Sequence, residues 1–192
     1  IDLHDGWLYV GEGSAVARVR FDVASGRVSG EPERIVTGLP EGGNHWTRTL
    51  RVGPDGFLYV SVGSSCNVCI EEDERRAALL RARLDGSGAE VYARGLRNAV
   101  GMDFNPKDRT LWSNDNQVDG MGDDQPPGEL NRIEKAGLDF GFPWYGGGRV
   151  RTNEYKNDTP PAGVVFPEVE QAPHAADLGL VFYTGTMFPE KY

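Results

Sequence analysis

A repeated turn-and-strand pattern with a period near 50 residues constrains the fold of this chain more than any other feature. Residues 5–10 (Asp-Gly-Trp-Leu-Tyr-Val) and 55–60 (Asp-Gly-Phe-Leu-Tyr-Val) are near copies, and residues 108–113 are a weaker third copy. The leucine of each copy recurs after 50 and then 53 positions. Because each copy couples a turn to an apolar, β-rich run, and because this period is typical of one propeller blade, the pattern predicts a β-propeller.

Further strand-like segments follow each copy in a constant order. The order is a second strand, a third strand, a Gly-rich crossing and an inner strand. After the first copy these lie at residues 16–21, 33–37, 38–40 and 49–52, and after the second copy at residues 78–84, 90–94, 95–97 and 100–104. Residues 130–133 are the second strand that follows the third copy. Radial repetition of four-stranded sheets predicts an all-β propeller. The chain supplies about three to four blades, whereas propellers close with roughly four to eight. We therefore expect residues 1–192 to form a single β-propeller domain that is partial at both ends, with a four-bladed or open arrangement as the alternative.

One segment sets helix propensity against the repeat. Glu, Arg, Ala and Leu dominate residues 71–83, and propensity alone would favour a helix there. Leu80, Ala82 and Leu84, however, alternate with arginines and occupy the place of residues 16–21 in the first copy. The repeat therefore predicts a strand over residues 78–84, with at most one helical turn before it.

The repeat fades beyond residue 138. Residues 139–148 and 159–173 are rich in Gly, Pro and polar side chains, which predicts long loops on one face of the propeller. Loops carried by rigid sheets are where function concentrates. The apolar run at residues 178–184 predicts the inner strand of a further blade.

The charge of the chain excludes some classes of partner. A formal net charge of -9 disfavours nucleic acid and anionic membranes. No apolar run is long enough to span a bilayer, so we expect no membrane insertion. The 26 Gly and 12 Pro, without a collagen period, suit many tight turns between short strands.

Residues 115–129 form the most unusual stretch. They hold four Asp, one Glu, three Gly and two Pro between two apolar runs, which indicates a loop with crowded carboxylates. Ca²⁺ would neutralise them, because it takes 6–8 oxygen ligands. Asp115, Gln117 and Asp119 imitate the opening of an EF-hand loop, but Pro126 stands where that loop has its bidentate Glu. The stretch predicts a cation site, and a solvated acidic loop is the alternative.

His45 and the pair Arg97-Asn98 occupy equivalent crossings before successive inner strands. A neutral histidine is suited to general base catalysis, although a lone histidine is often structural. Arginine grips carboxylates in a planar, bidentate manner and asparagine adds one donor and one acceptor, which suits an anionic or quinone-like ligand. An arginine that merely ties two blades together is the alternative. His4 and His174 show no partner pattern and are expected to be structural.

Cys66 and Cys69 are the only cysteines. A c-type haem would require His at position 70, which is Ile, and a zinc site would require further ligands at matching spacing. A short disulfide that closes a loop in an oxidising compartment is the favoured interpretation.

Several motifs together resemble the glucose/sorbosone dehydrogenase family. They are Gly43-Asn44-His45, Gly95-Leu96-Arg97-Asn98, Gly101-Met102-Asp103-Phe104, Asp123-Asp124, Gly128-Glu129-Leu130-Asn131, Asp139-Phe140-Gly141-Phe142-Pro143 and Gln171-Ala172-Pro173-His174. Their order and spacing cover most of the chain. Members of that family are six-bladed propellers that use pyrroloquinoline quinone and Ca²⁺ to oxidise sugars, and the Cys66 to Cys69 loop resembles one bacterial branch.

The resemblance implies roles for particular residues. His45 would be the base that takes the proton of the sugar C1 hydroxyl, while a hydride passes to the quinone and a lactone forms. Arg97 and Asn98 would hold the quinone. Ca²⁺ would be bound by the segment from Asp115 to Asp119, including the carbonyls of Gln117 and Val118. Further candidate ligands are Asp123, Asp124 and Glu129, which could instead bind a second, purely structural ion.

The resemblance also implies a setting and leaves rivals. The partners would be a small sugar and an external electron acceptor, and the location would be periplasmic or secreted. One rival is a Ca²⁺-dependent propeller hydrolase of lactonase type, which needs a histidine and carboxylates but not Arg97-Asn98. The other is a non-catalytic binding propeller in which Ca²⁺ is only structural.

Overall fold

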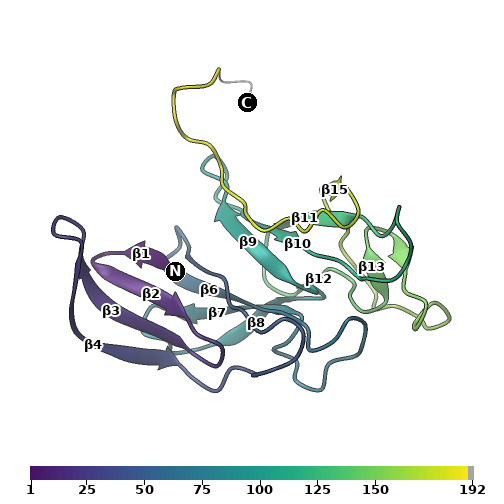
Figure 1. Ribbon diagram of the computed structural model, residues 1–192, viewed down its shortest axis with the longest axis horizontal. Coiled ribbons are helices and arrows are strands. Elements are labelled where there is room, and N and C mark those ends of the chain that lie inside the picture. Colours follow the sequence, from purple (N-terminus) through teal and green to yellow (C-terminus); the bar gives the residue numbers. More distant parts are fainter. Residues whose placement is uncertain (190–192) are drawn as a thin grey trace.

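Three mainly antiparallel sheets succeed one another along the chain in the computed structural model, which describes residues 1–189 (Figure 1). The first sheet has the order β1-β2-β3-β4 and contains β1 (Asp2–His4), β2 (Trp7–Gly11), β3 (Val16–Asp22) and β4 (Arg27–Val36). Asp5 and Gly6 form the β1–β2 turn with positive φ angles of 46° and 73°. The first copy of the repeat is thus the turn and the second strand of a four-stranded blade.

The second and third sheets repeat this order. The second, β12-β8-β7-β6-β5, contains β5 (Leu50–Val52), β6 (Phe57–Val62), β7 (Ala78–Arg83), β8 (Glu90–Arg94) and β12 (Leu138–Asp139). The third, β15-β11-β10-β9, contains β9 (Ala99–Phe104), β10 (Leu111–Asp115), β11 (Gly128–Ile133) and β15 (Val169–Gln171). Among residues 1–189 there is no helix, and residues 72–77 form turns and bends before β7. The predicted strand over residues 78–84 is therefore confirmed over residues 78–83.

The strands alternate their side chains between two apolar layers. Leu58 and Val60 of β6 join Tyr9 and Leu50 in a buried cluster between the first and second sheets. Tyr59, between them in sequence, belongs to a second cluster between the second and third sheets. Since successive side chains of a strand point to opposite faces, one strand serves both layers. This is how consecutive blades bury their faces against each other.

The structure corrects part of the prediction of long loops at residues 139–148 and 159–173. Asp139 lies in β12, which pairs in parallel with β8, and residues 169–171 form β15, the fourth strand of the third sheet. A separate hairpin of β13 (Tyr145–Gly147) and β14 (Val150–Arg151) lies between them. Strands of two or three residues are too short to show a period of two in the sequence, which is why they were missed.

The structure also corrects the strand predicted at residues 178–184. This segment is extended beside β9 (yellow in Figure 1), but within residues 1–189 it pairs with no strand. Side chains hold it instead: Asn114 donates to the Gly179 carbonyl at 3.1 Å, and Asp103 accepts from the Phe182 amide at 2.8 Å. It passes so close to Gly101 that a Cβ there would lie 2.8 Å from the Leu180 nitrogen. Within the described part of the chain, no helix is long and apolar enough to cross a membrane.

Candidate functional site

A cavity of about 310 Å³ lies where the crossings before β5 and β9 meet the loops of the third sheet. His45 lines it from the first crossing, and Arg97 and Asn98 line it from the second. The loop at residues 116–119 and the segment at residues 174–178 complete the wall. The structure therefore brings together the predicted base, the predicted cofactor residues and part of the acidic loop.

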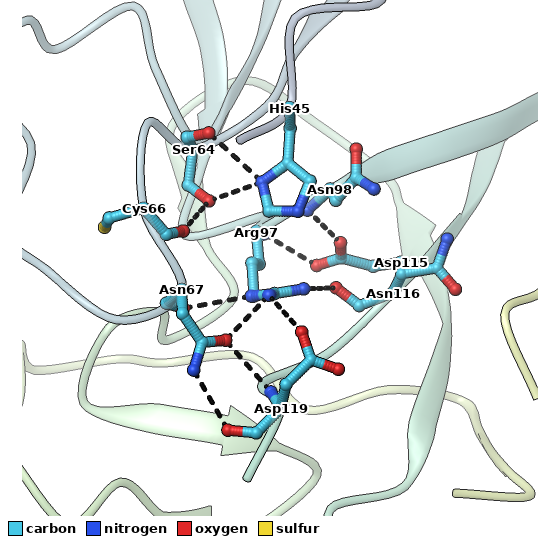
Figure 2. A network of polar contacts seen from close by, with 9 residues as sticks. All are labelled: His45, Ser64, Cys66, Asn67, Arg97, Asn98, Asp115, Asn116 and Asp119. Atoms are coloured by element: carbon cyan, nitrogen blue, oxygen red, sulfur yellow. Dashed lines mark hydrogen bonds and ion pairs between the residues drawn. The ribbon is translucent and has the colours of Figure 1, made fainter. Parts of the chain in front are cut away.

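His45 is held in one tautomer by Ser64. The imidazole Nδ1 lies 2.8 Å from Ser64 Oγ and 3.1 Å from the Ser64 carbonyl (Figure 2). Because the Ser64 hydroxyl donates its hydrogen to the Cys66 carbonyl at 2.7 Å, both Ser64 atoms accept from Nδ1–H. Nε2 consequently keeps its lone pair, and it has no hydrogen-bond partner among residues 1–189. Burial, and then the positive charge of Arg97, lower the pKa of His45, so the neutral base is favoured.

Two buried arginines hold the irregular segment that carries His45. Arg48 donates to the carbonyls of Thr47 at 2.8 Å and of His45 at 3.4 Å, and Arg76 donates to the Gly42 carbonyl at 3.0 Å. Gly63 admits the histidine, because a Cβ at that position would lie 2.4 Å from the His45 Cβ. The imidazole is thus positioned by backbone contacts that no sequence motif signals.

Arg97 uses most of its donors within the protein. Its side chain is 3% exposed, and Nε and Nη2 donate to the carbonyl and the Oδ1 of Asn67 at 3.0 and 2.8 Å. Nη1 donates to the Asn116 carbonyl at 3.0 Å, and Nη2 forms an ion pair with Asp119 at 3.1 Å (Figure 2). Arg97 therefore ties the second blade to the third, as the alternative interpretation expected, and one Nη1 hydrogen remains for a ligand.

Asn98 presents its side chain to the cavity. Its backbone amide donates to Asp115, while its side-chain amide makes no hydrogen bond with the residues that the structure describes. One acceptor and two donors are therefore available to a ligand at this point of the wall.

Asp115 and Glu129 are two buried carboxyls at opposed positions of the β10–β11 ladder. Asp115 accepts from the backbone amides of Arg97 and Asn98, at 2.9 and 2.5 Å. Burial raises the pKa of both carboxyls, and the charge of Asp115 raises that of Glu129 further. Two such groups cannot both be ionised in a dry interior unless a cation compensates them.

Two amides beside this pair each leave an oxygen without a partner. Gln117 Nε2 donates to Asp115 at 3.0 Å and Asn131 Nδ2 donates to Glu129 at 2.9 Å. Gln117 Oε1 and Asn131 Oδ1 are buried and accept no hydrogen bond among residues 1–189. Buried carboxylate and amide oxygens are the ligands that a hard cation prefers, so the residue types of this group fit Ca²⁺.

The remaining acidic candidates lie elsewhere. Asp119 is exposed and paired with Arg97, and Asp123 and Asp124 are exposed and do not line the cavity. Val118 is buried and lines the cavity, and its amide donates to the Gly146 carbonyl at 3.1 Å. The structure therefore groups Asp115, Gln117 and Glu129, leaves Asp119 at the cavity wall, and places Asp123 and Asp124 outside the cavity.

The Cys66–Cys69 disulfide is present, with a Cα–Cα separation of 6.1 Å. Both sulfurs lie near Glu71 Oε1, at 3.9 and 3.7 Å. In the described part of the chain this is the one trio of Cys, His or acidic ligand atoms within 4.8 Å, but the disulfide occupies both sulfurs. The cluster is a closed loop rather than a metal site.

His174 was missed as a cavity residue. It lines the cavity with a positive φ of 56°, and its Nε2 lies 2.7 Å from the Gly122 carbonyl. Asp177 also lines the cavity. Both lie far along the chain from the other site residues, in a segment without repeat signal, so only the folded structure joins them.

The three blades and the polar cavity between their crossings define a β-propeller with a candidate site at the blade crossings. The chain belongs to the family described as TrAA12-like, whose sequence model matches residues 1–143.

Two curated relatives have similar sequences. The chain is 37% identical over 150 residues to an uncharacterized protein of Borreliella burgdorferi, and the matched region covers 77% of this chain and 39% of the relative. It is 27% identical over 169 residues to the aldose sugar dehydrogenase YliI of Escherichia coli, covering 77% and 43%. The chain thus spans less than half the length of these relatives.

Solved structures share the fold. The iodide structure of a Trichoderma reesei family AA12 enzyme has a TM-score of 0.79 at 21% identity, covering 93% of this chain and 56% of the other. The calcium structure of the same enzyme has a TM-score of 0.76 at 20% identity, with 93% and 56% covered. The holo pyranose dehydrogenase PQQ domain of Coprinopsis cinerea has a TM-score of 0.77 at 19% identity, covering 96% and 56%. These likenesses confirm the predicted β-propeller fold. The predicted resemblance to sugar dehydrogenases agrees with the family match and with the relative named aldose sugar dehydrogenase.

Proposed function

We propose that this chain carries the sugar-oxidising site of a dehydrogenase that uses pyrroloquinoline quinone and Ca²⁺. The observation that carries the proposal is the His45 imidazole, fixed with its proton on Nδ1 and with Nε2 unpartnered among residues 1–189, on the wall of the cavity. The relatives add support, because one is named an aldose sugar dehydrogenase and one structure a pyranose dehydrogenase PQQ domain.

The chemistry of the cavity wall suits a flat, anionic cofactor. Arg97 has one Nη1 hydrogen left, and Asn98 has a complete free amide among the described residues. These groups would hold carbonyl and carboxylate oxygens of the quinone. When bound, the quinone would supply the acceptor for the hydride, which carries the two electrons of the oxidation and which no side chain can accept.

Ca²⁺ would be held beside it by the acidic loop. Asp115 and Glu129 provide charge, and the unpartnered oxygens of Gln117 and Asn131 provide neutral ligands. The carbonyls of Gln117 and Val118 and the carboxylate of Asp119 are the further ligands we propose, at the cavity wall. The exposed Asp123 and Asp124 would at most bind a second ion at the surface.

His45 would act on the sugar. Nε2 takes the proton of the C1 hydroxyl, C1 gives up a hydride, and the C1–O bond becomes the carbonyl of a lactone. The lowered pKa of His45 keeps Nε2 unprotonated near neutral pH. An aldose and an external electron acceptor would be the partners, and the disulfide favours a periplasmic or secreted location.

The test is reconstitution of the full natural chain with pyrroloquinoline quinone and Ca²⁺, followed by dye reduction with aldoses. His45→Ala should lower the rate of dye reduction by about 10²–10⁴-fold, the usual contribution of a general base, with cofactor binding unchanged. His4→Ala, in β1 and away from the cavity, is the matched control and should keep full activity.

Two results would replace the proposed function, and a third would change only the residue assigned as the base. Lactone hydrolysis without dye reduction would indicate a hydrolase of lactonase type, which also uses a histidine and Ca²⁺. Ca²⁺ binding with neither activity would indicate a binding propeller. Dye reduction that survives His45→Ala would show that another group is the base.

A further inference from the structure

The loop between β6 and β7 reaches across to the third blade, and Asn67 makes its hydrogen bonds there. Asn67 lies inside the ring closed by the Cys66–Cys69 disulfide, and it faces both Arg97 and Asp119 (Figure 2). The sequence singled out the loop from Cys66 to Cys69 but assigned Asn67 no role of its own.

Asn67 uses its whole amide and its carbonyl in these contacts. Oδ1 accepts from Arg97 Nη2 at 2.8 Å and from the Asp119 backbone amide at 2.9 Å. Nδ2 donates to the Asp119 carbonyl at 2.9 Å, and the Asn67 carbonyl accepts from Arg97 Nε at 3.0 Å. The side chain therefore pairs with the backbone of Asp119 much as a neighbouring strand would.

The chemistry of this contact requires an amide. An acceptor is needed for the Arg97 guanidinium and the Asp119 amide, and a donor is needed for the Asp119 carbonyl. Aspartate offers no donor, and alanine offers neither. Asp119 ends the wall segment at residues 116–119, which has no ladder partner, so Asn67 supplies the backbone pairing that a sheet would otherwise provide.

The disulfide-closed ring that carries Asn67 makes two further contacts near the cavity. Its Cys66 carbonyl accepts the hydrogen of Ser64, whose oxygens hold His45. Val68 packs against a small buried cluster that includes Val118. The same four-residue ring thus contacts the support of the base and the wall that faces it.

We propose that Asn67 is a positioning residue, held ready by the disulfide-closed loop, that fixes the Arg97 guanidinium and the backbone of the loop at Asp119. The effect on catalysis rests on the proposed function, in which Arg97 and this loop hold the quinone and Ca²⁺. The effect on Arg97 itself does not, and it is measurable without cofactor.

The first measurement is the exchange of the Arg97 Nε–H proton with solvent, followed by NMR in the cofactor-free protein. In the native protein this proton is bonded to the Asn67 carbonyl and should exchange slowly. Asn67→Ala removes the hydrogen bond from Arg97 Nη2 to Asn67 Oδ1 and the pairing with Asp119. The exchange of the Nε–H proton should therefore become at least about tenfold faster. Asn67→Asp keeps the acceptor for Arg97, so exchange should stay slow.

The second measurement is binding and turnover in the reconstituted full chain. Both variants lose the donor to the Asp119 carbonyl, so the dissociation constant of pyrroloquinoline quinone with Ca²⁺ should rise about 10–100-fold, as for other supporting contacts around a metal site. The rate at saturating cofactor should fall less, because His45 is not touched. Ile70→Ala, an exposed position next to the ring, should change neither quantity.

Native-like Arg97 exchange in Asn67→Ala, or a cofactor dissociation constant within twofold of the native value in both variants, would overturn the proposal. A lowered melting temperature with both quantities unchanged would assign Asn67 a purely structural role and would overturn it as well. If the native protein oxidises no sugar, the proposed function fails, while the exchange measurement still decides whether Asn67 positions Arg97.

Discussion

Two hairpins with the same register differ in the polarity of the side chains that they bury. In β6–β7 the cross-strand pairs that face the preceding blade are Leu58–Ala82, Val60–Leu80 and Val62–Ala78. In β10–β11 the aligned pairs, in the same order, are Leu111–Ile133, Ser113–Asn131 and Asp115–Glu129. All twelve side chains are buried. The first pair is apolar in both hairpins, whereas the next two pairs are apolar in the second blade and polar in the third.

The difference separates what the repeat determines from what the site requires. Burying Val60 and Val62 stabilises the second blade by removing apolar surface from water. Burying Asp115 and Glu129 costs free energy unless hydrogen bonds and a counter-charge offset it. The third blade keeps the register and the burial of a blade, but its interior holds the residue types that the proposed cation site would need.

The largest expected effect concerns the aligned positions 115 and 62. Asp115→Ala leaves the buried amides of Arg97 and Asn98 without an acceptor, at about 1–3 kcal/mol each, so the free energy of unfolding should fall by about 2–6 kcal/mol. Val62→Ala removes two methyl groups and should lower it by about 1.5 kcal/mol. Urea denaturation at pH 5 measures both. A smaller loss for Asp115→Ala than for Val62→Ala would contradict the capping role of this carboxyl.

The next effect concerns the aligned positions 80 and 131. Leu80→Ala opens a cavity in the apolar cluster and should cost about 2–5 kcal/mol, whereas Asn131→Ala removes one hydrogen bond and should cost about 0.5–1.5 kcal/mol. Repeating the urea denaturation with Ca²⁺ sharpens the comparison. The cost of Asn131→Ala should then grow, because its oxygen becomes a ligand, and the cost of Leu80→Ala should stay the same. Equal responses to Ca²⁺ would argue against Asn131 as a ligand.

The comparison shows what the sequence could predict. The turn-and-strand repeat recovers the order of the blades, because each copy places its leucine, Leu8, Leu58 or Leu111, in an equivalent position of a ladder. It could not reveal β12 and β15, because these short strands join their sheets through backbone hydrogen bonds that depend on the finished fold.

The candidate site was predictable only where residue types are unusual. The crowded acids of residues 115–129 indicated a cation, but the sequence did not distinguish the buried Asp115 and Glu129 from the exposed Asp123 and Asp124. That distinction depends on the ladder, which places Asp115 opposite Glu129. Ser64 and Asn67 were invisible because ordinary polar residues gain a role only through the contacts they make.

A slope of up to about 1.4 kcal/mol per pH unit for each proton should appear in the pH dependence of stability. Burial and the charge of Asp115 raise the pKa of Glu129 from 4.5 to about 8. The folded state therefore binds more protons than the unfolded state within this window, so in a chelator the free energy of unfolding should fall as the pH rises from about 4.5 to about 8.

Two additions test the origin of this slope in the same urea denaturation series. Ca²⁺ should flatten it, because the metal stabilises the ionised carboxylates and competes with protons. Glu129→Gln should reduce it to the part that Asp115 contributes, because burial also raises the pKa of Asp115, to about 7. A slope in Glu129→Gln that equals the native slope would place the titrating group elsewhere in the molecule.

The smallest effect compares two apolar blades with each other, at the aligned residues Tyr9 and Tyr59. The Tyr59 hydroxyl donates to Asp55 Oδ2 at 2.7 Å, whereas the Tyr9 hydroxyl lies 3.5 Å from the Leu84 carbonyl. Tyr59→Phe should lower the free energy of unfolding by about 0.5–1.5 kcal/mol, the worth of one hydrogen bond, and Tyr9→Phe should lower it by less. Urea denaturation at pH 7 measures both. Equal losses would mean that burial, rather than the bond to Asp55, sets the worth of this hydroxyl, and that copies of the repeat differ energetically only where their interiors turn polar, as in the third blade.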